Sequence, residues 1–312
     1  MHEHVFLNLI PEFRGVGLLN DADLMARELE AFTAAGGGAM VELTGAELTV
    51  GAAPDPGGHF RGVADSGFPE HGTRTVNHVL ALAEISERTG VHLILGTGHY
   101  RDPYLTDGWL DRRSATDIAQ RLIADLTEGF PGTSVRAGII GEIGADKWFI
   151  SPVEERSFRA AGRAHRATGV PITTHAARWP VGVAQLDLLA EEDVDPRNVI
   201  IGHCDGVNIP EYHLAIAQRG AFVQFDTIRG GGAYDVELRV ACVMRLARAG
   251  HLDQILLSQD VCRRDHLSAT GGCGYVYILN RFRAELSRAG LDDGEIEQLL
   301  IGNPQRALGG AR

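Results

Sequence analysis

The chain has 312 residues, a length at the upper edge of one domain and common for a single (β/α)8 barrel. Its hydrophobic fraction of 44% and charged fraction of 22% are those of a globular protein, and no apolar run approaches the roughly 18 residues needed to span a bilayer. The formal net charge of -12 argues against a nucleic-acid partner, because phosphate binding requires a basic stripe.

Strand-like runs rich in Val, Ile and Leu alternate with amphipathic stretches of helical period along the whole chain. The predicted strands are, in chain order, residues 39–44, 91–96, 135–144, 171–175, 198–203, 221–228 and 254–258. The predicted helices are residues 21–35, 73–89, 115–128, 153–168, 181–192, 210–219, 236–249, 276–289 and 293–300. Strand followed by helix forces parallel neighbours, and eight such units close into a barrel. We therefore predict an α/β fold, a single (β/α)8 TIM barrel domain over residues 1–312.

The first strand of this barrel is the exception. His2 and His4 belong at its C-terminal end, yet only Met1 precedes them, so we expect most of that strand to be missing from this chain. If the two histidines then sit on a frayed end, the barrel is open between its last strand and its second. In that case a chain extended upstream binds metal more tightly than this one.

A long loop after the second strand spans residues 51–72 and is rich in Gly, Pro and Asp. It carries His59 and His71. We expect it on the active face as a lid or specificity loop, with a disordered surface insert as the alternative.

Six potential metal ligands lie where the hydrophobic runs end: His2, His4, Glu142, His175, His203 and Asp260. Residues two apart in a strand point to the same face, so His2 and His4 present two imidazoles together and Glu3 points away. A HxH pair alone is a weak signal, and its weight comes from the other four. The C-terminal ends of parallel barrel strands converge on one face, where we expect these side chains to meet.

The residue types favour a two-metal hydrolase. We expect His2, His4 and Asp260 on one ion, His175 and His203 on its neighbour, and Glu142 shared between them. Asp260 is the predicted catalytic acid and base, which accepts a proton from a metal-bridging hydroxide. Two divalent ions are expected, zinc first, with manganese, iron or cobalt as alternatives.

Eight segments resemble the phosphotriesterase-related proteins of the amidohydrolase superfamily, and within them the phosphotriesterase homology protein branch. They are His2-Glu3-His4 and residues 96–100, 137–144, 171–175, 201–205, 224–228, 257–260 and 271–275. The resemblance implies a (β/α)8 barrel with a binuclear centre. Organophosphate-cleaving members bridge their metals with a carbamylated lysine, where this chain has Glu142. Thr227 stands where they carry a proton-relay histidine, which argues against fast phosphotriester cleavage.

Lactone-hydrolysing relatives place a tyrosine beside the bridging hydroxide, and Tyr100 lies at that position of the motif. We expect Tyr100 to be catalytic and substrate-binding, with ordinary packing as the alternative. Arginines follow several strand ends, and Arg229 and Arg263 are the predicted contacts to an anionic substrate group, with Arg178 and Arg264 as further candidates. Asp205 and Asp226 are candidates for orienting ligands, with structural hydrogen bonding as the alternative.

The cysteines lack CxxC spacing and are expected to stay reduced: Cys204, Cys242, Cys262 and Cys273. The chain carries no secretory signal, so we expect a cytoplasmic protein without membrane partners. Its expected partner is a small-molecule substrate, and a homodimer stays an open option. The predicted activity is hydrolysis of a lactone or carboxylic ester. The alternatives are an amidase for N-acyl amino or sulfonic acids, a phosphotriesterase side activity, and a metal-binding barrel without activity.

Overall fold

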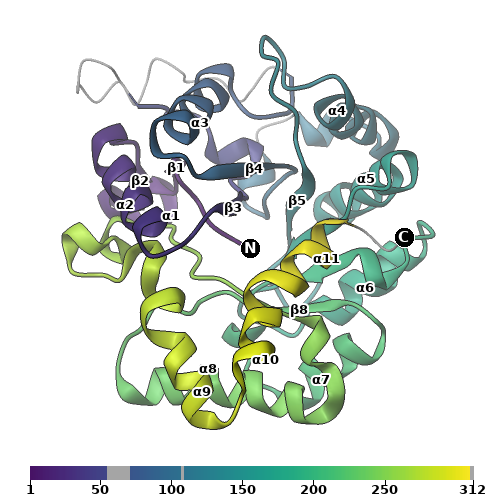
Figure 1. Ribbon diagram of the computed structural model, residues 1–312. Coiled ribbons are helices and arrows are strands. Elements are labelled where there is room, and N and C mark those ends of the chain that lie inside the picture. The colour runs from purple at the N-terminus through teal and green to yellow at the C-terminus, as the bar shows by residue number, and fades with distance from the viewer. Residues whose placement is uncertain (55–70, 107–108, 310–312) are drawn as a thin grey trace.

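The computed structural model describes residues 1–54, 71–106 and 109–309, and shows a parallel sheet curled into a ring with helices around it (Figure 1). The sheet has neighbouring strands in sequence order, β3 to β9. Its strands are β3 (Ala39–Glu42), β4 (His92–Thr97), β5 (Ile139–Gly144), β6 (Ile172–His175), β7 (Val199–Ile201), β8 (Phe222–Phe225) and β9 (Ile255–Leu257). All seven predicted strands are confirmed. The long loop predicted at 51–72 lies mostly outside the described residues.

Helices connect successive strands and cover the outside of the ring. They are α2 (Ala22–Ala34), α3 (Val76–Thr89), α4 (Ala115–Thr127), α5 (Pro152–Thr168), α6 (Gly182–Ala190), α7 (Pro210–Gln218), α8 (Ala233–Leu246), α9 (Arg283–Ala289), α10 (Asp293–Glu297) and α11 (Asn303–Gly309). The helix predicted at 276–289 is present as a continuous helical run, in which a π-helical turn, Ile278–Phe282, precedes α9. Among the described residues, no helix combines the length and hydropathy that crossing a membrane requires.

The N-terminal segment closes the ring. The amide of Glu3 donates to Val41 O (3.0 Å), and Leu43 N donates to Glu3 O (2.9 Å), which makes a parallel bridge to the β3 side. On the other side, Asp260 N donates to His2 O (3.1 Å). This short stretch takes the place of the first strand, so the prediction of a (β/α)8 barrel with a largely missing first strand is confirmed. The expectation of a frayed end is wrong, since His2 is fully buried.

The side chain of Glu3 reinforces this closure. Its Oε1 accepts hydrogen bonds from Ser258 Oγ (2.7 Å) and Gln259 N (2.8 Å), and its Oε2 accepts one from Val261 N (2.9 Å). Glu3 points away from the two flanking histidines, as the strand period predicts. The carboxylate thus holds the backbone on both sides of Asp260.

A small hairpin that the sequence did not reveal follows the N-terminal segment. It consists of β1 (Leu7–Asn8), α1 (Ile10–Phe13) and β2 (Leu18–Leu19), with β1 and β2 antiparallel. Strands of two residues are too short to produce a periodic pattern. The hairpin matters for the site because α1 carries Glu12 to the mouth of the barrel.

Two apolar clusters divide the core. The larger one packs the helices against the outside of the sheet. The smaller one fills the inside of the barrel with Val41, Ile139, Ile200 and Leu256 from alternate strands of the sheet, and Ala307 of α11 contacts it. Figure 1 shows α11 lying across the ring of strands. A filled interior leaves the carboxyl ends of the strands as the open face.

Candidate metal centre and cavity

Six buried polar side chains face one another at the carboxyl ends of the strands. They are the residues that the sequence singled out: His2, His4, Glu142, His175, His203 and Asp260. Three trios among the described residues each have ligand atoms within 4.8 Å of one another. The first is His2, His4 and Asp260, the second is Glu142, His175 and His203, and a third joins His2 and His203 to Asp226. The structure therefore brings all six predicted ligands together, and we call them the floor of the cavity.

Glu142 lies between the first and second trios. Its Oε2 is 3.3 Å from His2 Nε2. Its Oε1 is 2.5 Å from His175 Nδ1 and 3.5 Å from His203 Nε2. One carboxylate oxygen thus faces His2 of the first trio and the other faces the histidines of the second, which is the arrangement that a shared ligand requires.

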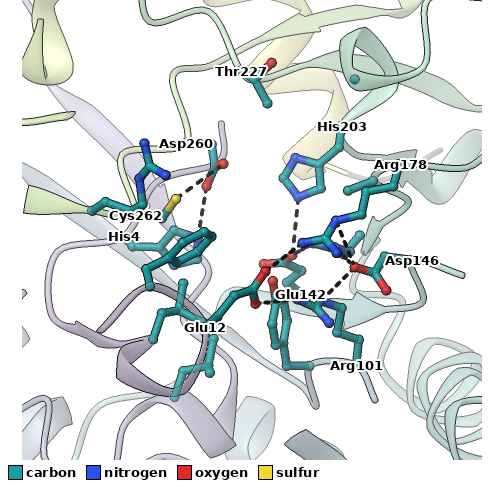
Figure 2. A pocket seen from close by; sticks show the side chains of 18 of the residues that line it. His4, Glu12, Arg101, Glu142, Asp146, Arg178, His203, Thr227, Asp260 and Cys262 are labelled. Atoms are coloured by element: carbon teal, nitrogen blue, oxygen red, sulfur yellow. Dashed lines mark hydrogen bonds and ion pairs between the residues drawn. The ribbon is translucent and has the colours of Figure 1, made fainter. Parts of the chain in front are cut away.

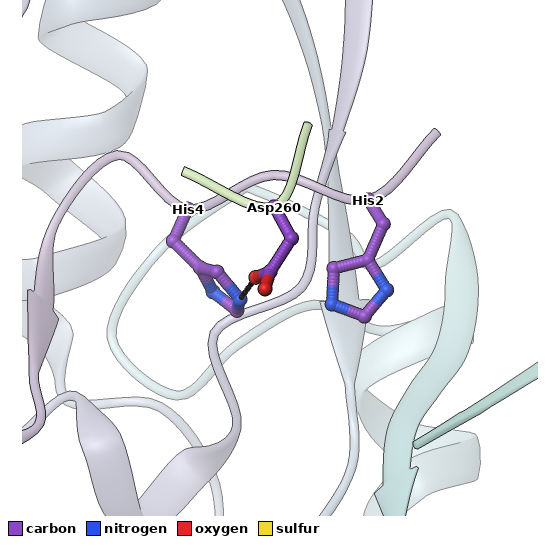
Figure 3. Close-up of side chains that lie close together, drawn as sticks. All are labelled: His2, His4 and Asp260. Carbon is purple, nitrogen blue, oxygen red and sulfur yellow. Dashed lines mark ion pairs between the residues drawn. The ribbon is translucent and has the colours of Figure 1, made fainter. Parts of the chain in front are cut away.

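The first trio joins the two ends of the sheet. His4 Nε2 lies 3.4 Å from Asp260 Oδ1. Figure 3 shows His2 and His4 projecting to the same side of their segment, with the Asp260 carboxylate between them. The ends of the barrel therefore contribute one half of the site, and the central strands contribute the other.

Several of these buried atoms have no hydrogen-bond partner among the described residues. They are both ring nitrogens of His2, Glu142 Oε2 and His175 Nε2. A buried polar atom without a partner costs about 1–3 kcal/mol, so such atoms at one place need an explanation. Imidazole nitrogens with carboxylate oxygens are the donor set of zinc and of other divalent transition metals. The floor residues therefore fit the binuclear centre that the sequence predicted.

The histidines and carboxylates of the floor shift each other's pKa values. Burial alone would lower the pKa of His2, but the carboxylates of Glu142 and Asp226 raise it to about 10. Against the effect of burial, His2 and His175 hold the pKa of Glu142 well below its usual range. The raised pKa of His2 favours its protonated form, and a cation at this place would have to displace that proton.

Asp226 is hydrogen-bonded to His203 and lies close to His2. Its Oδ1 lies 2.7 Å from His203 Nδ1, and its Oδ2 lies 3.3 Å from His2 Nδ1. The amide of His203 and the side chain of Gln224 also donate to this carboxylate. Asp226 is thus occupied by hydrogen bonds, and it leaves the Nε2 atoms of both histidines facing Glu142.

His4 is oriented by a chain of buried polar groups. Its Nδ1 lies 3.1 Å from Thr44 Oγ1, which donates to Glu42 Oε1 (2.5 Å). Arg74 pairs with Glu42 and keeps the pKa of that buried carboxyl low. Because the threonine hydroxyl donates to the carboxylate, its oxygen accepts from His4 Nδ1, and Nε2 is left free for a ligand role.

The backbone around the floor is unusual. His203 and Asp260 have φ values of 55° and 48°, in the left-handed region that residues other than glycine rarely adopt. Gly141, before Glu142, has φ 138°, and a Cβ there would lie 2.4 Å from Thr173 O. Only glycine fits this position, so β5 and β6 can approach each other beside Glu142.

Tyr100 lines the cavity as the sequence predicted. Its ring centroid lies 5.0 Å from that of His175, at a steep angle. Burial and the nearby charge of Glu142 raise its pKa well above the usual value. The phenol therefore stays protonated and can donate a hydrogen bond into the cavity.

The two predicted substrate arginines are both engaged within the protein. Arg229 Nη1 donates to Asp260 O (2.5 Å) and Asp260 Oδ2 (3.0 Å), and with His4 it lowers the pKa of Asp260 against the effect of burial. Arg263 pairs with Asp265 (2.9 Å) and lies over the Phe13 ring. Arg229 is thus placed to position Asp260, and substrate contact by either arginine stays a prediction.

Thr227 and Asp205 contact each other beside the floor. Thr227 lines the cavity, and its hydroxyl donates to Asp205 Oδ2 (2.6 Å). Cys262 lines the cavity as well, with its Sγ 3.7 Å from Asp260 Oδ2. All four cysteines are free in the structure, and their redox state stays a prediction.

A second group of charged residues surrounds the mouth of the cavity, and we call it the rim cluster: Glu12, Arg101, Asp146 and Arg178 (Figure 2). Glu12 accepts from both arginines, at 2.7 Å in the case of Arg178. Asp146 Oδ2 lies 3.1 Å from Arg101 Nε and 3.6 Å from Arg178 Nε. Except for Arg178, these residues were missed by sequence reasoning. Arg101 and Asp146 follow strand ends, and this position could have marked them as candidate site residues. Glu12 lies in the hairpin that the sequence did not reveal, so it had no such signal.

The cavity above the floor has a volume of about 300 Å³. Leu9, Phe13 and Leu48 contribute an apolar wall on the side of the N-terminal hairpin. A space of this size has room for a small molecule, and most of its lining side chains are polar or charged.

Comparisons with known proteins agree with this geometry. The sequence profile of the Phosphotriesterase family matches residues 70–308. The phosphotriesterase homology protein of Escherichia coli (strain K12) is 37% identical over 225 residues, 72% of this chain and 77% of that protein. An N-acetyltaurine hydrolase of Tetraodon nigroviridis is 27% identical over 303 residues, 93% of this chain and 78% of that protein.

Solved structures share the fold. The crystal structure of the phosphotriesterase homology protein from E. coli, complexed with phosphate in the active site, has a TM-score of 0.84 at 30% identity and covers 98% of this chain and 97% of that one. The structure of a lactonase from Listeria monocytogenes has a TM-score of 0.83 at 23% identity, covers 100% of this chain and 94% of that one, and shows similarity of fold alone.

Proposed function

Since the chain belongs to the phosphotriesterase family of hydrolases, we propose that it is a binuclear metal-dependent hydrolase of small carbonyl compounds. The observation that carries this proposal is the Glu142 carboxylate, which turns one oxygen to His2 of the first buried trio and the other to His175 and His203. His2, His4 and Asp260 would hold one cation, and His175 and His203 the other. Zinc is the first candidate for this donor set.

Bound divalent cations would supply an activated water and polarise the carbonyl oxygen of the substrate. Asp260 would accept the proton of that water and return it to the leaving group. Arg229 supports this role, because its guanidinium keeps the Asp260 carboxyl ionised and holds both its side chain and its carbonyl. The phenol of Tyr100 would donate a hydrogen bond to the substrate from the side of His175.

We place lactones or other carboxylic esters first as substrates. Tyr100 supports this choice, since it lies at the motif position of the tyrosine in lactone-hydrolysing relatives and faces the cavity. Amides such as N-acyl amino or sulfonic acids are the second candidate, favoured by the resemblance to an N-acetyltaurine hydrolase over 93% of the chain.

Phosphotriester cleavage is expected only as a side activity. Thr227 occupies the place of a proton-relay histidine, and its hydroxyl is engaged with Asp205. A threonine in this position cannot shuttle a proton at neutral pH as an imidazole does.

The test begins with metal content per chain, measured by elemental analysis on protein purified without chelators. We expect about two ions per chain. The relative kcat/KM values for a lactone, an N-acyl amine and an aryl phosphotriester then rank the three reactions, with the lactone highest. A chain that takes up at most one ion when saturated, or that turns over none of the three, would instead be a metal-binding barrel without activity.

A further inference from the structure

The carboxylate of Glu12 is held between two guanidinium groups at the cavity mouth. Arg178 Nη2 donates to its Oε1 at 2.7 Å, and Arg101 Nη2 donates to its Oε2. Tyr104 OH adds a third donor at 3.3 Å. These contacts come from the loops after β4 and β6 and converge on one carboxylate (Figure 2). The same donors fit the carboxylate or sulfonate of a small molecule.

The rim cluster lies next to the floor. Asp146 Oδ2, which contacts both arginines, is 4.0 Å from Nε2 of the candidate ligand His175. The guanidinium of Arg101 also lies 5.0 Å from the centre of the Tyr100 ring. An anionic group bound by the two arginines would therefore be a short chain away from a carbonyl group at the floor.

The charges around the cavity favour an anion. Its described lining has four carboxylates and four guanidiniums, namely Glu12, Glu142, Asp146, Asp260, Arg101, Arg178, Arg229 and Arg263. Two of those carboxylates, Glu142 and Asp260, are candidate metal ligands. Once they hold cations, Glu12 and Asp146 are the lining carboxylates that remain for Arg101 and Arg178, while Arg229 stays on Asp260 and Arg263 on Asp265. The bound cations and the two rim arginines would then make the mouth a local arrangement suited to attract small anions, on a chain of formal charge -12.

Arg178 has properties of a residue that moves between partners. Its side chain is 61% exposed, although both of its ion-pair partners are largely buried. Its φ of 68° lies in the left-handed region, where strained residues other than glycine cluster at ligand sites. Glu12 sits on the short α1 of the hairpin, so its carboxylate can withdraw without any change in the barrel strands.

We infer that Arg101 and Arg178 bind a carboxylate or sulfonate group of the substrate, and that the Glu12 carboxylate occupies this position until the substrate displaces it. The inference rests on the proposed function, because it deepens the substrate class to small acyl compounds that carry an anionic group. The Glu12 carboxylate then selects against neutral substrates, because a neutral group cannot take its place in the ion pairs with Arg101 and Arg178.

A pair of chromogenic esters tests this assignment. 4-Nitrophenyl hydrogen glutarate and 4-nitrophenyl pentanoate have acyl chains of equal length, and only the first carries a terminal carboxylate. On the metal-loaded protein we expect a higher kcat/KM for the glutarate ester. Arg178→Met should raise its KM about tenfold to a hundredfold, as loss of a charged hydrogen bond does. The KM for the pentanoate ester should stay within about twofold.

Glu12→Gln should change the KM for the glutarate ester in the opposite direction. Without the competing carboxylate, the KM for the glutarate ester should fall about threefold or more. A purely structural ion pair predicts that both variants lose activity together, on both esters. Arg88→Met removes an exposed ion pair with Asp23 that does not line the cavity, and it should leave both KM values unchanged. Equal effects of Arg178→Met on the two esters would overturn the inference.

Binding without turnover separates this inference from the proposed function. Isothermal titration compares ethanesulfonate with the neutral ethyl methyl sulfone on the metal-loaded protein and on Arg178→Met. Weaker ethanesulfonate binding in the variant supports the anion site even if no ester is hydrolysed. Sulfonate binding that the variant leaves intact, or sulfone binding of equal strength, counts against the site even if the chain proves to be an active hydrolase.

Discussion

The floor of the cavity and the rim cluster both consist of charged side chains at strand ends or loops, yet they differ in how they are held. The side chain of Glu142 is 1% exposed, whereas that of Arg178 is 61% exposed. Two floor histidines are fixed through their Nδ1 atoms, His203 by Asp226 and His4 by Thr44. The rim is held by ion pairs that a solute can exchange. A centre for bond cleavage needs fixed geometry, and a selective entrance needs replaceable partners.

The largest expected effect is a loss of turnover when a floor residue is replaced, and it should distinguish the floor from the rim cluster most clearly. Asp260→Asn keeps the size of the side chain but cannot accept a proton, so kcat should fall about a thousandfold on every substrate. Its thermal unfolding should stay close to that of the parent. An unchanged kcat would remove Asp260 from the proposed mechanism. A rim variant such as Arg178→Met should instead alter the preference between substrates.

The orientation of His4 comes next. Thr44→Val removes the hydroxyl that faces His4 Nδ1 but leaves the Glu42 and Arg74 ion pair in place. Metal affinity should fall about tenfold to a hundredfold, which competition with a chelator measures. Thr89→Val removes a buried hydroxyl within α3 and is the matched control. If both variants bind metal equally well, Thr44 does not hold the ligand.

Tyr100 lies between floor and rim, and its variant tests to which of them it belongs. Tyr100→Phe should lower kcat for a lactone about tenfold, because a hydrogen-bond donor to the substrate is lost. KM should change less. A loss confined to KM for anionic substrates would place Tyr100 with the rim cluster, and unchanged kinetics would mean that it only packs there.

The smallest expected effect on activity comes from replacing His78, a buried residue of α3 outside the cavity. His78 of α3 is fully buried with its Nε2 2.8 Å from Phe6 O, and burial lowers its pKa to about 4. Since an unfolded histidine has a pKa near 6.5, the neutral fold has its full stability above that value and loses it as pH falls from about 6.5 to 4. The loss is at most about 3 kcal/mol.

His78→Gln cannot take up this proton, so its denaturation midpoint should depend less on pH in that window. The difference between the two pH profiles isolates His78 from the other titrating histidines. Parallel profiles would show that His78 does not carry this dependence. Turnover near neutral pH should be the same in both proteins.

The sequence predicted the floor far better than the rim. Glu142, His175 and Asp260 close or follow hydrophobic runs, and parallel strands bring their ends together whatever the loops do. Glu12 has no such signal, because two strands of two residues carry it to the cavity. The partners of the floor histidines were only partly accessible. Asp226 was a candidate from its strand end, but Thr44 reaches His4 through a contact between residues 40 apart in the chain.

Closure of the barrel by the N-terminal segment has a consequence for the order of folding. The amide of Asp260 bonds to the carbonyl of His2, and the Ser258 hydroxyl bonds to Glu3, across about 255 residues of chain. Contacts of such long sequence separation form late, because the whole intervening loop must be ordered first. The second trio, from β5 to β7, is complete once about two thirds of the chain has been synthesised. Under the proposed function, metal capture should therefore proceed in two stages, and the cation that His2, His4 and Asp260 would hold should enter last.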